Sequence, residues 1–463
     1  MQLQFPDLQV LILAAGEGKR MRSSKPKVLH TLLGKAMVMH VLHAAEELSP
    51  RNIIIVTGHG SERVRAHIGA PQNLDWVEQE EQLGTGHAVL ECEATIQGGE
   101  HVLIVCGDTP LLQASTLANL VEAHTHANAS VSFMTATLPD ATGYGRVVRD
   151  EQGEIKRVVE HRDASEDERL IGEVNTGIFC VRRKDLFSLL KQVGNQNDQK
   201  EYNLPDIIPL ALAEGKAVLG VPMQDSQEMY GINNRQQLAV AEQAMQRKII
   251  EAWQLQGVTI ENPESVRIEA SVSIGSDTTI RAGSQLLGAT HIGDECEIGP
   301  YAVIHNAWLD DRIKVLPFTH IEEANLGAGT YAGPFARLRP GAKLDEDVRV
   351  GNFVEVKQSV IGRGSKINHL SYVGDTYMGS GCNIGAGTIT CNYDGANKHQ
   401  TMIGDRVFVG SDTKLVAPVS VGDDATIGAG SIVTKPVHAG GLTLSARPEQ
   451  RHLPDWQRPR KND

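Results

Sequence analysis

The sequence predicts two domains of different fold class: an α/β domain with a mostly parallel sheet, followed by a left-handed parallel β-helix of hexapeptide repeats. In the first half, short aliphatic runs alternate with helical patterns, whereas in the second half aliphatic residues recur every six positions. A chain of 463 residues is also too long for one ordinary hydrophobic core. Its few aromatic residues (4%) and its 46 glycines suit regular layers that stack closely on small and aliphatic side chains.

Residues 1–235 show the alternation of strand and helix patterns that is typical of βαβ units. The aliphatic runs include residues 10–15, 52–58 and 101–108, and the helical patterns include residues 37–48 and 115–127. Sheets of this kind bind ligands at the carboxyl ends of their strands. The glycine loop after residue 15 and the carboxylate of Asp108 are therefore expected at the same edge.

Residues 236–256 contain no glycine or proline and carry apolar side chains at helical spacing, which predicts an amphipathic connecting helix. In residues 257–463 the six-residue period begins at Ile268 and is interrupted by a polar stretch at residues 390–402. Such a period is typical of a parallel β-helix, in which each coil stacks its aliphatic residues on the coil below. The left-handed course departs from the usual crossover rule. The polar stretch must leave the coil as a loop.

Composition excludes several classes of function. The formal net charge of −13 disfavours binding to nucleic acid or a membrane through bulk charge, so anionic ligands require local basic clusters. The six cysteines are scattered without a CxxC pair, and we expect free thiols rather than disulfides or a zinc site. The N-terminal apolar run is too short for a membrane helix and lacks a basic leader, so we expect a cytoplasmic protein.

The loop LAAGEGKRM, followed by KPKVLH, is the first candidate site. It is neither a Walker A sequence nor a complete GxGxxG fingerprint. Its glycines nevertheless let backbone N–H groups approach phosphates, and Lys19, Arg20 and Lys27 supply positive charge. A tight strand-to-helix turn with solvated basic residues is the alternative interpretation.

The second candidate site lies in the β-helix, around GNFVEVK and INHLSYVGD. Glu355 and Lys357 alternate with valines on one strand and so share a face. His369 follows 14 residues after Glu355, close to the length of one coil, and we expect the two side chains on adjacent coils. A carboxylate that orients a histidine is a general-base arrangement. A β-helix that serves only as a spacer or trimerisation rod is the alternative.

An ordered series of motifs resembles one enzyme family. The series is LAAGEGKRM, KPKVLH, QLGTGHA, CGDTPL, GYGR, VEHRDA, EVNTGI and GINNR, ahead of a hexapeptide-repeat half. It is similar to the bifunctional bacterial N-acetylglucosamine-1-phosphate uridyltransferases and glucosamine-1-phosphate acetyltransferases, over nearly the whole chain. The resemblance implies a Rossmann-like nucleotidyltransferase domain at residues 1–235, a linker helix at 236–256, and a β-helix acetyltransferase domain with a C-terminal tail at 257–463. Cys106 departs from the aromatic residue expected in the CGD motif.

The resemblance implies residues for uridylyl transfer, in which a sugar phosphate attacks the α-phosphate of UTP. Catalysis of this kind depends on charge neutralisation and positioning. Arg20 and Lys27 would neutralise phosphates, while Asp108 and Asn233 would hold Mg²⁺, which prefers oxygen ligands. The other implied uridylyl substrate contacts are Leu13, Ala14, Ala15, Gly16, Gln79, Gln82, Gly84, Thr85, Gly145, Glu160, Asn175 and, again, Asn233.

The resemblance also implies an acetyl-transfer site. His369, helped by Glu355, would take a proton from the amine of glucosamine-1-phosphate as that amine attacks acetyl-CoA directly. The implied contacts to the sugar phosphate are Arg339, Lys357, Tyr372 and Asn383, and those to acetyl-CoA are Ala386, Asn392, Tyr393, Ser411, Ala429 and Arg447. Members of the family are implied to form homotrimers through the β-helix.

We therefore predict an enzyme that acetylates glucosamine-1-phosphate and then couples the product to UTP. Its partners are small sugar phosphates, without nucleic acid or membrane insertion. One alternative is a monofunctional sugar-1-phosphate nucleotidyltransferase with a structural or regulatory β-helix, which the polar set around His369 disfavours. Another is a non-catalytic assembly protein, which the presence of Asp108, Lys27 and Arg20 disfavours.

Overall fold

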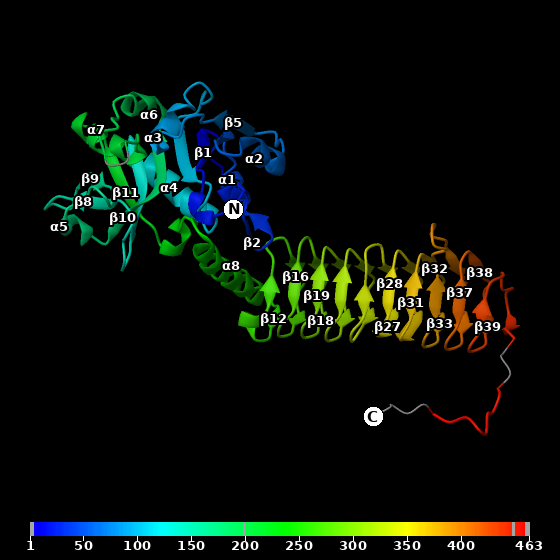
Figure 1. Cartoon of the computed structure of the whole chain (residues 1–463). Coiled ribbons are helices and arrows are strands. Elements are labelled where there is room, and N and C mark those ends of the chain that lie inside the picture. The colour runs from blue at the N-terminus through cyan, green and yellow to red at the C-terminus, as the bar shows by residue number, and fades with distance from the viewer. Residues whose placement is uncertain (1–3, 198–199, 447–449, 459–463) are drawn as a thin grey trace. The chain divides into compact units, whose positions relative to one another are not determined.

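The computed structural model describes residues 4–197, 200–446 and 450–458. The chain divides into two compact units, residues 1–245 and residues 246–463. The first is an α/β unit and the second is a β-helix (Figure 1). None of the helices in the described part of the chain combines the length and the apolar character that a membrane crossing requires.

The first unit is organised by a mostly parallel sheet. Its strands are β1 (Leu8–Ala14), β4 (Asn52–Thr57), β5 (Leu74–Glu78), β6 (His101–Cys106), β7 (Val131–Thr137), β10 (Glu173–Arg182) and β11 (Val218–Pro222). They lie in the order β11-β7-β10-β6-β1-β4-β5, and only β10 runs antiparallel to its neighbours β6 and β7. The hairpin of β8 (Arg146–Arg149) and β9 (Ile155–Val159) pairs with β10. The predicted parallel sheet is confirmed.

Helices cover both faces of this sheet because side chains of each strand alternate between two cores. The helices are α1 (Met37–Glu46), α2 (Ser61–Ile68), α3 (Thr85–Leu90), α4 (Ala114–His126), α5 (Glu166–Arg169), α6 (Arg183–Leu190) and α7 (Ile207–Ala213). On β1, Val10 and Ile12 pack in one core with residues of α1 and α4, whereas Leu11 packs in the other with residues of α3, α6 and α7. Each face of the sheet therefore has its own hydrophobic core.

Helix α8 (Arg235–Leu255) agrees with the predicted amphipathic helix to within one residue at each end. Its last turns pack Ile249, Ile250 and Trp253 against the core of the β-helix. The first strand of the β-helix begins soon afterwards, at Thr259.

The strands of the second unit form three parallel sheets, called here faces 1, 2 and 3. Face 1 runs from β12 (Thr259–Ile260) to β41 (Gly441–Thr443), face 2 from β13 (Arg267–Ile268) to β40 (Ile432–Val433), and face 3 from β14 (Ser273–Ile274) to β38 (Val419–Val421). Each coil visits the faces in that order. Hexad residues such as Ile280, Leu286 and Ile292 are fully buried between them. The left-handed β-helix is confirmed, and its coils stack in a regular row (Figure 1).

The coil length decides which side chains stack. On face 1, Asn352 of β27 (Arg349–Asn352) pairs with His369 of β30 (Lys366–His369), 17 residues later. On face 2, Glu355 of β28 (Glu355–Lys357) pairs with Tyr372 of β31 (Tyr372–Gly374). Between β34 (Ile389–Cys391) and β35 (Thr401–Ile403) the chain leaves the coil, as the polar stretch predicts.

Adjacent residues of β29 (Val360–Ile361) offer a matched test of the core. Ile361 is fully buried, whereas Val360 is 40% exposed. We expect Ile361→Ala to lower the free energy of unfolding of the β-helix by about 2–5 kcal/mol, because it leaves a cavity. Val360→Ala should stay within about 0.5 kcal/mol. Denaturant titration of both variants checks this, and equal losses would contradict the assigned orientation of the strand.

Stability of the first unit should depend on the protonation of His124. This histidine is buried on α4, its Nδ1 shares a 2.8 Å hydrogen bond with Ser132 Oγ, and the ring of His101 lies edge-on at 5.0 Å. Burial, followed by the charges of His101 and Arg182, lowers the pKa of His124 from 6.5 to about 4. The unfolded chain therefore takes up a proton that the folded unit refuses as pH falls from 6.5 to about 4. We expect the unfolding free energy to fall across this window and His124→Gln to flatten the slope in pH-dependent denaturation.

Candidate active sites

The glycine loop after β1 forms one wall of a cavity of about 290 Å³. The residues that line it include Leu13, Ala14, Ala15, Gly16, Lys27, Gln79, Gln82, Gly84, Thr85, Cys106 and Asp108. Gly18 has a φ of 68°, and a Cβ added there would lie 2.6 Å from Lys27 Cβ. Glycine at this position lets the loop close against Lys27. The residues predicted for a nucleotide thus meet in one place, which supports the prediction.

Lys27 joins two strand-end segments of the sheet. Its ammonium donates to Asp108 Oδ2, just beyond β6, and to Asn233 Oδ1 at 3.0 Å. The loop that carries Asn233 is held in turn by a 2.9 Å hydrogen bond from Ile232 N to Asp108 O. The side chains of Lys27 and Asp108 are only 13% and 17% exposed. Three segments distant in the sequence therefore converge on one charged cluster.

The same geometry tests whether a metal ion suits the site. Asp108 Oδ2 and Asn233 Oδ1 face a single cation position, which the ammonium of Lys27 marks. Carboxylate and amide oxygens suit a hard divalent cation whose other positions go to water and phosphate. Among the described residues there is no group of three or more His, Cys, Asp or Glu side chains that could hold a metal by itself. The donor set therefore fits an ion that is shared with a phosphorylated substrate.

Polar side chains complete the far wall of this cavity. Gln79 is buried, and its Nε2 donates to Gly84 O at 3.1 Å, which leaves its Oε1 as an acceptor. Gln82 Nε2 donates to Ala15 O at 2.9 Å and so ties this wall to the glycine loop. A Cβ at Gly84 would lie 2.6 Å from Tyr202 O, so only glycine fits there. Thr85 Oγ1 accepts from Leu204 N at 3.0 Å.

A second cavity of about 290 Å³ adjoins the first and shares Leu13, Thr85 and Cys106 with it. Gly145, Glu160 and Asn175, the predicted sugar contacts, line it together. Asn175 N donates to Gly145 O at 2.9 Å, and Gly177, at a φ of 80°, donates its N–H to Asn175 Oδ1 at 3.1 Å. That bond leaves the Asn175 side-chain N–H groups available to a ligand.

Burial also shapes the chemistry of the second cavity. Burial, followed by the charge of Asp206, raises the pKa of Glu160. Burial raises the pKa of the Cys106 thiol to about 12. This raised pKa favours the neutral thiol at ordinary pH. Its small side chain stands where the two cavities meet.

The structure places in the two cavities residues that the sequence interpretation missed, and it leaves one predicted residue outside them. Tyr144, Glu201 and Asn203 line the cavities, and only Tyr144 lay in a recognised motif, GYGR. The segment around Glu201 and Asn203 carries no pattern that would have revealed it. Arg20, on the 3₁₀ turn η1 (Lys19–Met21), is exposed and is absent from the described residues that line either cavity.

In the β-helix, the predicted sugar-phosphate residues stack on successive coils of face 2. Glu355 lies between Arg337 and Tyr372 in register, and Arg339 follows Arg337 by two residues. The guanidinium of Arg339 donates to Glu355 Oε1 at 2.7 Å. The carboxylate of Glu355 is thus engaged with a cation rather than with an imidazole.

The expected contact between Glu355 and His369 is corrected by the structure. His369 Nδ1 shares a 2.9 Å hydrogen bond with Asn352 Oδ1. Stacking requires a separation of 17 residues here, not 14, so the residue above Glu355 is Tyr372. Because the Asn352 oxygen accepts, His369 Nδ1 is the donor, and in the neutral ring Nε2 is then the acceptor. The arrangement still presents a base, oriented by an amide instead of a carboxylate.

Three cations gather on face 2, around Lys357. The ammonium of Lys398, in the protruding loop, lies against Lys357 and lowers its pKa, and Arg339 adds to the effect. Cations that lie this close together favour the binding of an anion between them. Lysine and arginine side chains commonly bind phosphate. Lys398 was not predicted, since nothing in the sequence relates it to Lys357.

The protruding loop is held in shape by one carboxylate. Asp394 Oδ1 accepts from the backbone N–H groups of Ala396 at 2.8 Å and Asn397 at 2.7 Å, and its Oδ2 meets His399 Nε2 at 2.7 Å. These bonds, the one from Asn397 first, lower the pKa of Asp394. Tyr393 is 61% exposed at the loop's surface. Asn392, at its base, is buried and donates to Tyr372 Oη at 3.4 Å.

The remaining predicted acetyl-CoA contacts fall at one corner of the β-helix. Asn383 belongs to β33 (Asn383–Ile384), and Ala386 follows two residues after that strand. Ile384, Val409 and Ile427 pair in register, so Ser411 and Ala429, each two residues further on, stand at the same corner on the next coils. A Cβ at Gly410 would lie 2.4 Å from Ala429 N, which keeps these coils closely stacked. Arg447 lies outside the described residues.

Comparison with protein-family models recognises both units. A model described as MobA-like NTP transferase domain matches residues 10–199. Models described as bacterial transferase hexapeptide (six repeats) and hexapeptide repeat of succinyl-transferase match residues 271–306 and 400–435. The matches agree with the α/β unit and the β-helix in kind and in order.

Curated relatives cover the chain nearly from end to end. A protein of Idiomarina loihiensis named bifunctional protein GlmU is 47% identical over 98% of this chain and 98% of its own length. Proteins of the same name from Acidithiobacillus ferrooxidans and Cupriavidus pinatubonensis are 45% and 46% identical and cover 98% of this chain and 99% of their own length. With both halves matched in one alignment, the chain belongs to the family of bifunctional GlmU proteins, which join a nucleotidyltransferase domain to a hexapeptide-repeat acyltransferase domain.

Proposed function

We propose that the chain makes UDP-N-acetylglucosamine in two steps. Residues 257–463 transfer an acetyl group from acetyl-CoA to the amine of glucosamine-1-phosphate. Residues 1–235 then transfer a uridylyl group from UTP to the product and release pyrophosphate, and residues 236–256 join the two parts. The observation that carries the proposal is that each unit of the chain holds its own polar cluster. The first has the Lys27 cluster beside two adjoining cavities, and the second has the His369–Asn352 pair on face 1 and three cations on face 2.

In the uridylyl-transfer site the residues act by positioning and by charge, because the reaction is an in-line displacement at phosphorus. Backbone N–H groups of the glycine loop receive the phosphates of UTP. Lys27, with Arg20 at the rim, neutralises their charge, and the wall around Gln79 and Thr85 receives the uridine. The second cavity, which adjoins the first, holds the sugar through Glu160 and Asn175.

Asp108 and Asn233 would hold Mg²⁺ in this site, since both offer oxygen atoms toward one cation position. The ion supplies charge neutralisation at the phosphates when it is bound. In the structure the ammonium of Lys27 bonds to the oxygen atoms of Asp108 and Asn233. Because Lys27 also lines the cavity, its ammonium is placed to leave those oxygens and pair with an entering phosphate.

In the acetyl-transfer site His369 acts as general base. The amine of glucosamine-1-phosphate attacks the thioester carbonyl, its proton passes to His369 Nε2, and the carbon–sulfur bond breaks to leave coenzyme A, which receives the proton. Asn352 keeps the imidazole in the reactive tautomer. Lys357, Lys398 and Arg339 receive the sugar phosphate, and Glu355 acts through its ion pair with Arg339.

Contacts to acetyl-CoA come from the protruding loop and the adjoining corner, through Asn392 and Tyr393 together with Ala386, Ser411 and Ala429. The sugar ring meets Tyr372 and Asn383. We also propose that the chain assembles as a homotrimer through the β-helix, because most oligomers of this kind are closed and symmetric.

Asp108→Asn tests the first site. We expect uridylyl transfer to fall by about 10²–10³-fold, because a preorganised charge at the phosphates is lost. Binding of Mn²⁺ in the presence of UTP, followed by electron paramagnetic resonance, should weaken in parallel. Asp75→Asn, an exposed carboxylate on β5, is the matched control and should change neither quantity. Unchanged Mn²⁺ binding in Asp108→Asn would remove Asp108 from the metal site.

His369→Ala tests the second site. Release of free thiol from acetyl-CoA in the presence of glucosamine-1-phosphate should fall by about 10²–10⁴-fold, the usual contribution of a general base. Uridylyl transfer to N-acetylglucosamine-1-phosphate should be retained, since it occurs in the other unit. His320→Ala, on face 2 of the β-helix, controls for loss of an unrelated histidine. If the native protein transfers uridylyl groups but releases no thiol, the β-helix is a scaffold and the monofunctional alternative holds.

A further inference from the structure

The protruding loop of the β-helix is a short hairpin. His399 N donates to Asn392 O at 2.8 Å, and Tyr393 forms an antiparallel bridge with Lys398. Asp394 caps the turn between these two strands through the backbone N–H groups that it accepts. Tyr393 and Lys398 are therefore held opposite each other, and the hairpin has a defined shape of its own.

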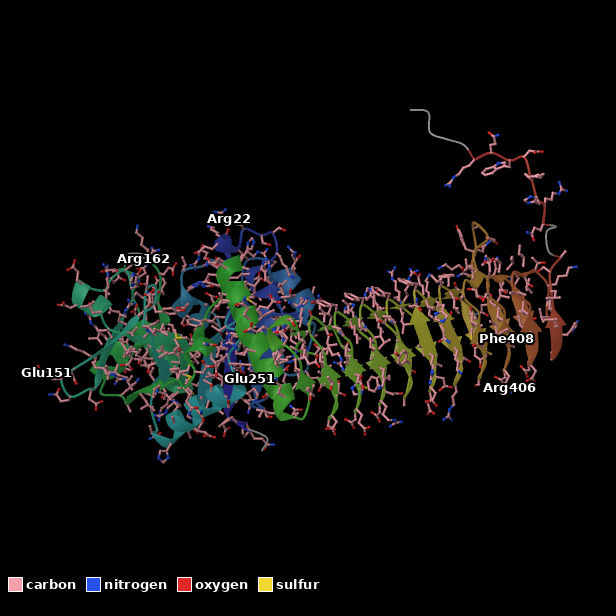
Figure 2. The ribbon with its side chains drawn as sticks, turned by 90° about the horizontal axis from the view of Figure 1, so that it is seen from below. Arg22, Glu151, Arg162, Glu251, Arg406 and Phe408 are labelled. Atoms are coloured by element: carbon pink, nitrogen blue, oxygen red, sulfur yellow. The ribbon has the colours of Figure 1, made fainter. Side chains whose placement is uncertain are left out.

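The place of the hairpin depends on one residue of the coil, Asp375. The hairpin stands out from the row of coils, on the side away from Arg406 and Phe408 (Figure 2), so its position is set by the bonds at its base. Asp375 Oδ2 accepts from Asn392 Nδ2 where the chain leaves the coil. The backbone O of Asp375 accepts from Thr401 N at 3.2 Å where the chain returns. Asp375 is thus bonded to both ends of the hairpin.

The neighbours of Asp375 make room for the bond to Asn392. A Cβ at Gly374 would lie 2.9 Å from Asn392 Nδ2, so a side chain there would push the amide away. Gly374 N donates to Thr390 Oγ1 at 2.8 Å, which ties the strand that leads into the hairpin to the same coil. Asn392 is only 8% exposed, and a buried amide N–H needs a hydrogen-bond partner.

Coil closure does not by itself require an aspartate at this corner. Asp375 has a φ of 48°, in the left-handed region that aspartate and asparagine adopt more readily than most residues. On the four preceding coils the same corner, between faces 2 and 3, is formed by Asn306, Glu323, Gly341 and Gln358, with φ between 44° and 79°. Several residue types therefore close the corner, and the carboxylate at position 375 has a further role.

The carboxylate also offsets the cations on face 2. Asp375 N donates to Lys357 O at 3.1 Å, which places Asp375 on the coil next to Lys357. The ammonium of Lys398 lowers the pKa of Lys357, as do burial and Arg339, whereas the charge of Asp375 raises it. A negative charge at this point reduces the repulsion that would otherwise push Lys398, and the hairpin with it, away from Lys357.

We propose that Asp375 is a positioning residue of the acetyl-transfer site. By anchoring the hairpin it fixes where Asn392, Tyr393 and Lys398 stand, and so determines how tightly acetyl-CoA binds. The chemical step is unaffected, because His369 lies on face 1. The effect on acetyl-CoA rests on the proposed acetyl-transfer function, whereas the anchoring of the hairpin does not.

Two substitutions at position 375 separate the bond from the backbone conformation. Glycine and asparagine both suit the left-handed region, so the coil should close in Asp375→Gly and in Asp375→Asn. Only asparagine keeps a side-chain oxygen that accepts from Asn392. In thiol release we expect the KM for acetyl-CoA to rise about 10–100-fold in Asp375→Gly, with kcat within about 3-fold of native. Asp375→Asn should keep both constants within about 3-fold of native.

Trypsin provides a measurement that does not depend on acetyl transfer. Cleavage after Lys398 should be at least about 10-fold faster in Asp375→Gly than in the native chain, because a protease needs the hairpin to leave the coil. Cleavage after Arg406, on the other side of the β-helix, serves as the internal reference and should not change. Mass spectrometry identifies both cuts.

Glu323→Gly is the matched control. Glu323 is exposed and closes the same corner on an earlier coil, at a φ of 45°. This variant removes a carboxylate from the same backbone conformation without touching the base of the hairpin. It should leave KM, kcat and the rate of cleavage after Lys398 at their native values, and uridylyl transfer should be native in all three variants.

Three outcomes overturn the proposal: an Asp375→Gly variant that keeps the native KM or the native rate of cleavage after Lys398, a loss of kcat without a change in KM, or an Asp375→Asn variant as impaired as Asp375→Gly. A native chain that releases no thiol, while cleavage after Lys398 still responds to Asp375→Gly, would instead reject the acetyl-transfer function and leave the anchoring of the hairpin standing.

Discussion

The register of hydrogen bonds between successive coils is the constraint on which the second unit depends. Each strand pairs in parallel with the strand one coil before it, and this pairing allows little slippage because the inward hexad residues must remain buried. The position of a side chain on one coil is therefore set by the pairing of its strand with the strand of the preceding coil. For this reason the imidazole of His369 meets Asn352, and Tyr372 pairs in register with Glu355.

The first unit depends on a different constraint, the common direction of its parallel strands, which also brings residues distant in sequence together. Parallel strands deliver their carboxyl ends to one edge of the sheet, so the glycine loop after β1 and Asp108 after β6 become neighbours although some 90 residues of chain separate them. Asn233 arrives there through the loop bonded to the Asp108 backbone. The outcome is a cluster of opposite charges beside two cavities, which is what phosphoryl chemistry requires of a protein.

Several features were accessible from the sequence because they depend on local pattern. The hexads from Ile268 onward, the helix that became α8 and the excursion at residues 390–402 each follow from periodicity or from its interruption. The wall formed by Gln79, Gln82, Gly84 and Thr85 was accessible only through resemblance, and the structure brings these residues to one cavity. The pairing of Glu355 with His369 was wrong because 14 residues fall three short of the 17-residue coil at this level, so the two residues belong to different faces.

What the sequence by itself determined is the character of each segment: which side chains turn inward, where glycine permits a close approach, and which loop carries the cations. Such properties depend on neighbours within a few residues. Only the tertiary structure decided that Asn352 orients His369 and that Lys398 stands against Lys357. Those contacts join residues that coil closure or sheet topology brings together, and their distance in sequence carries no local signal of their proximity in space.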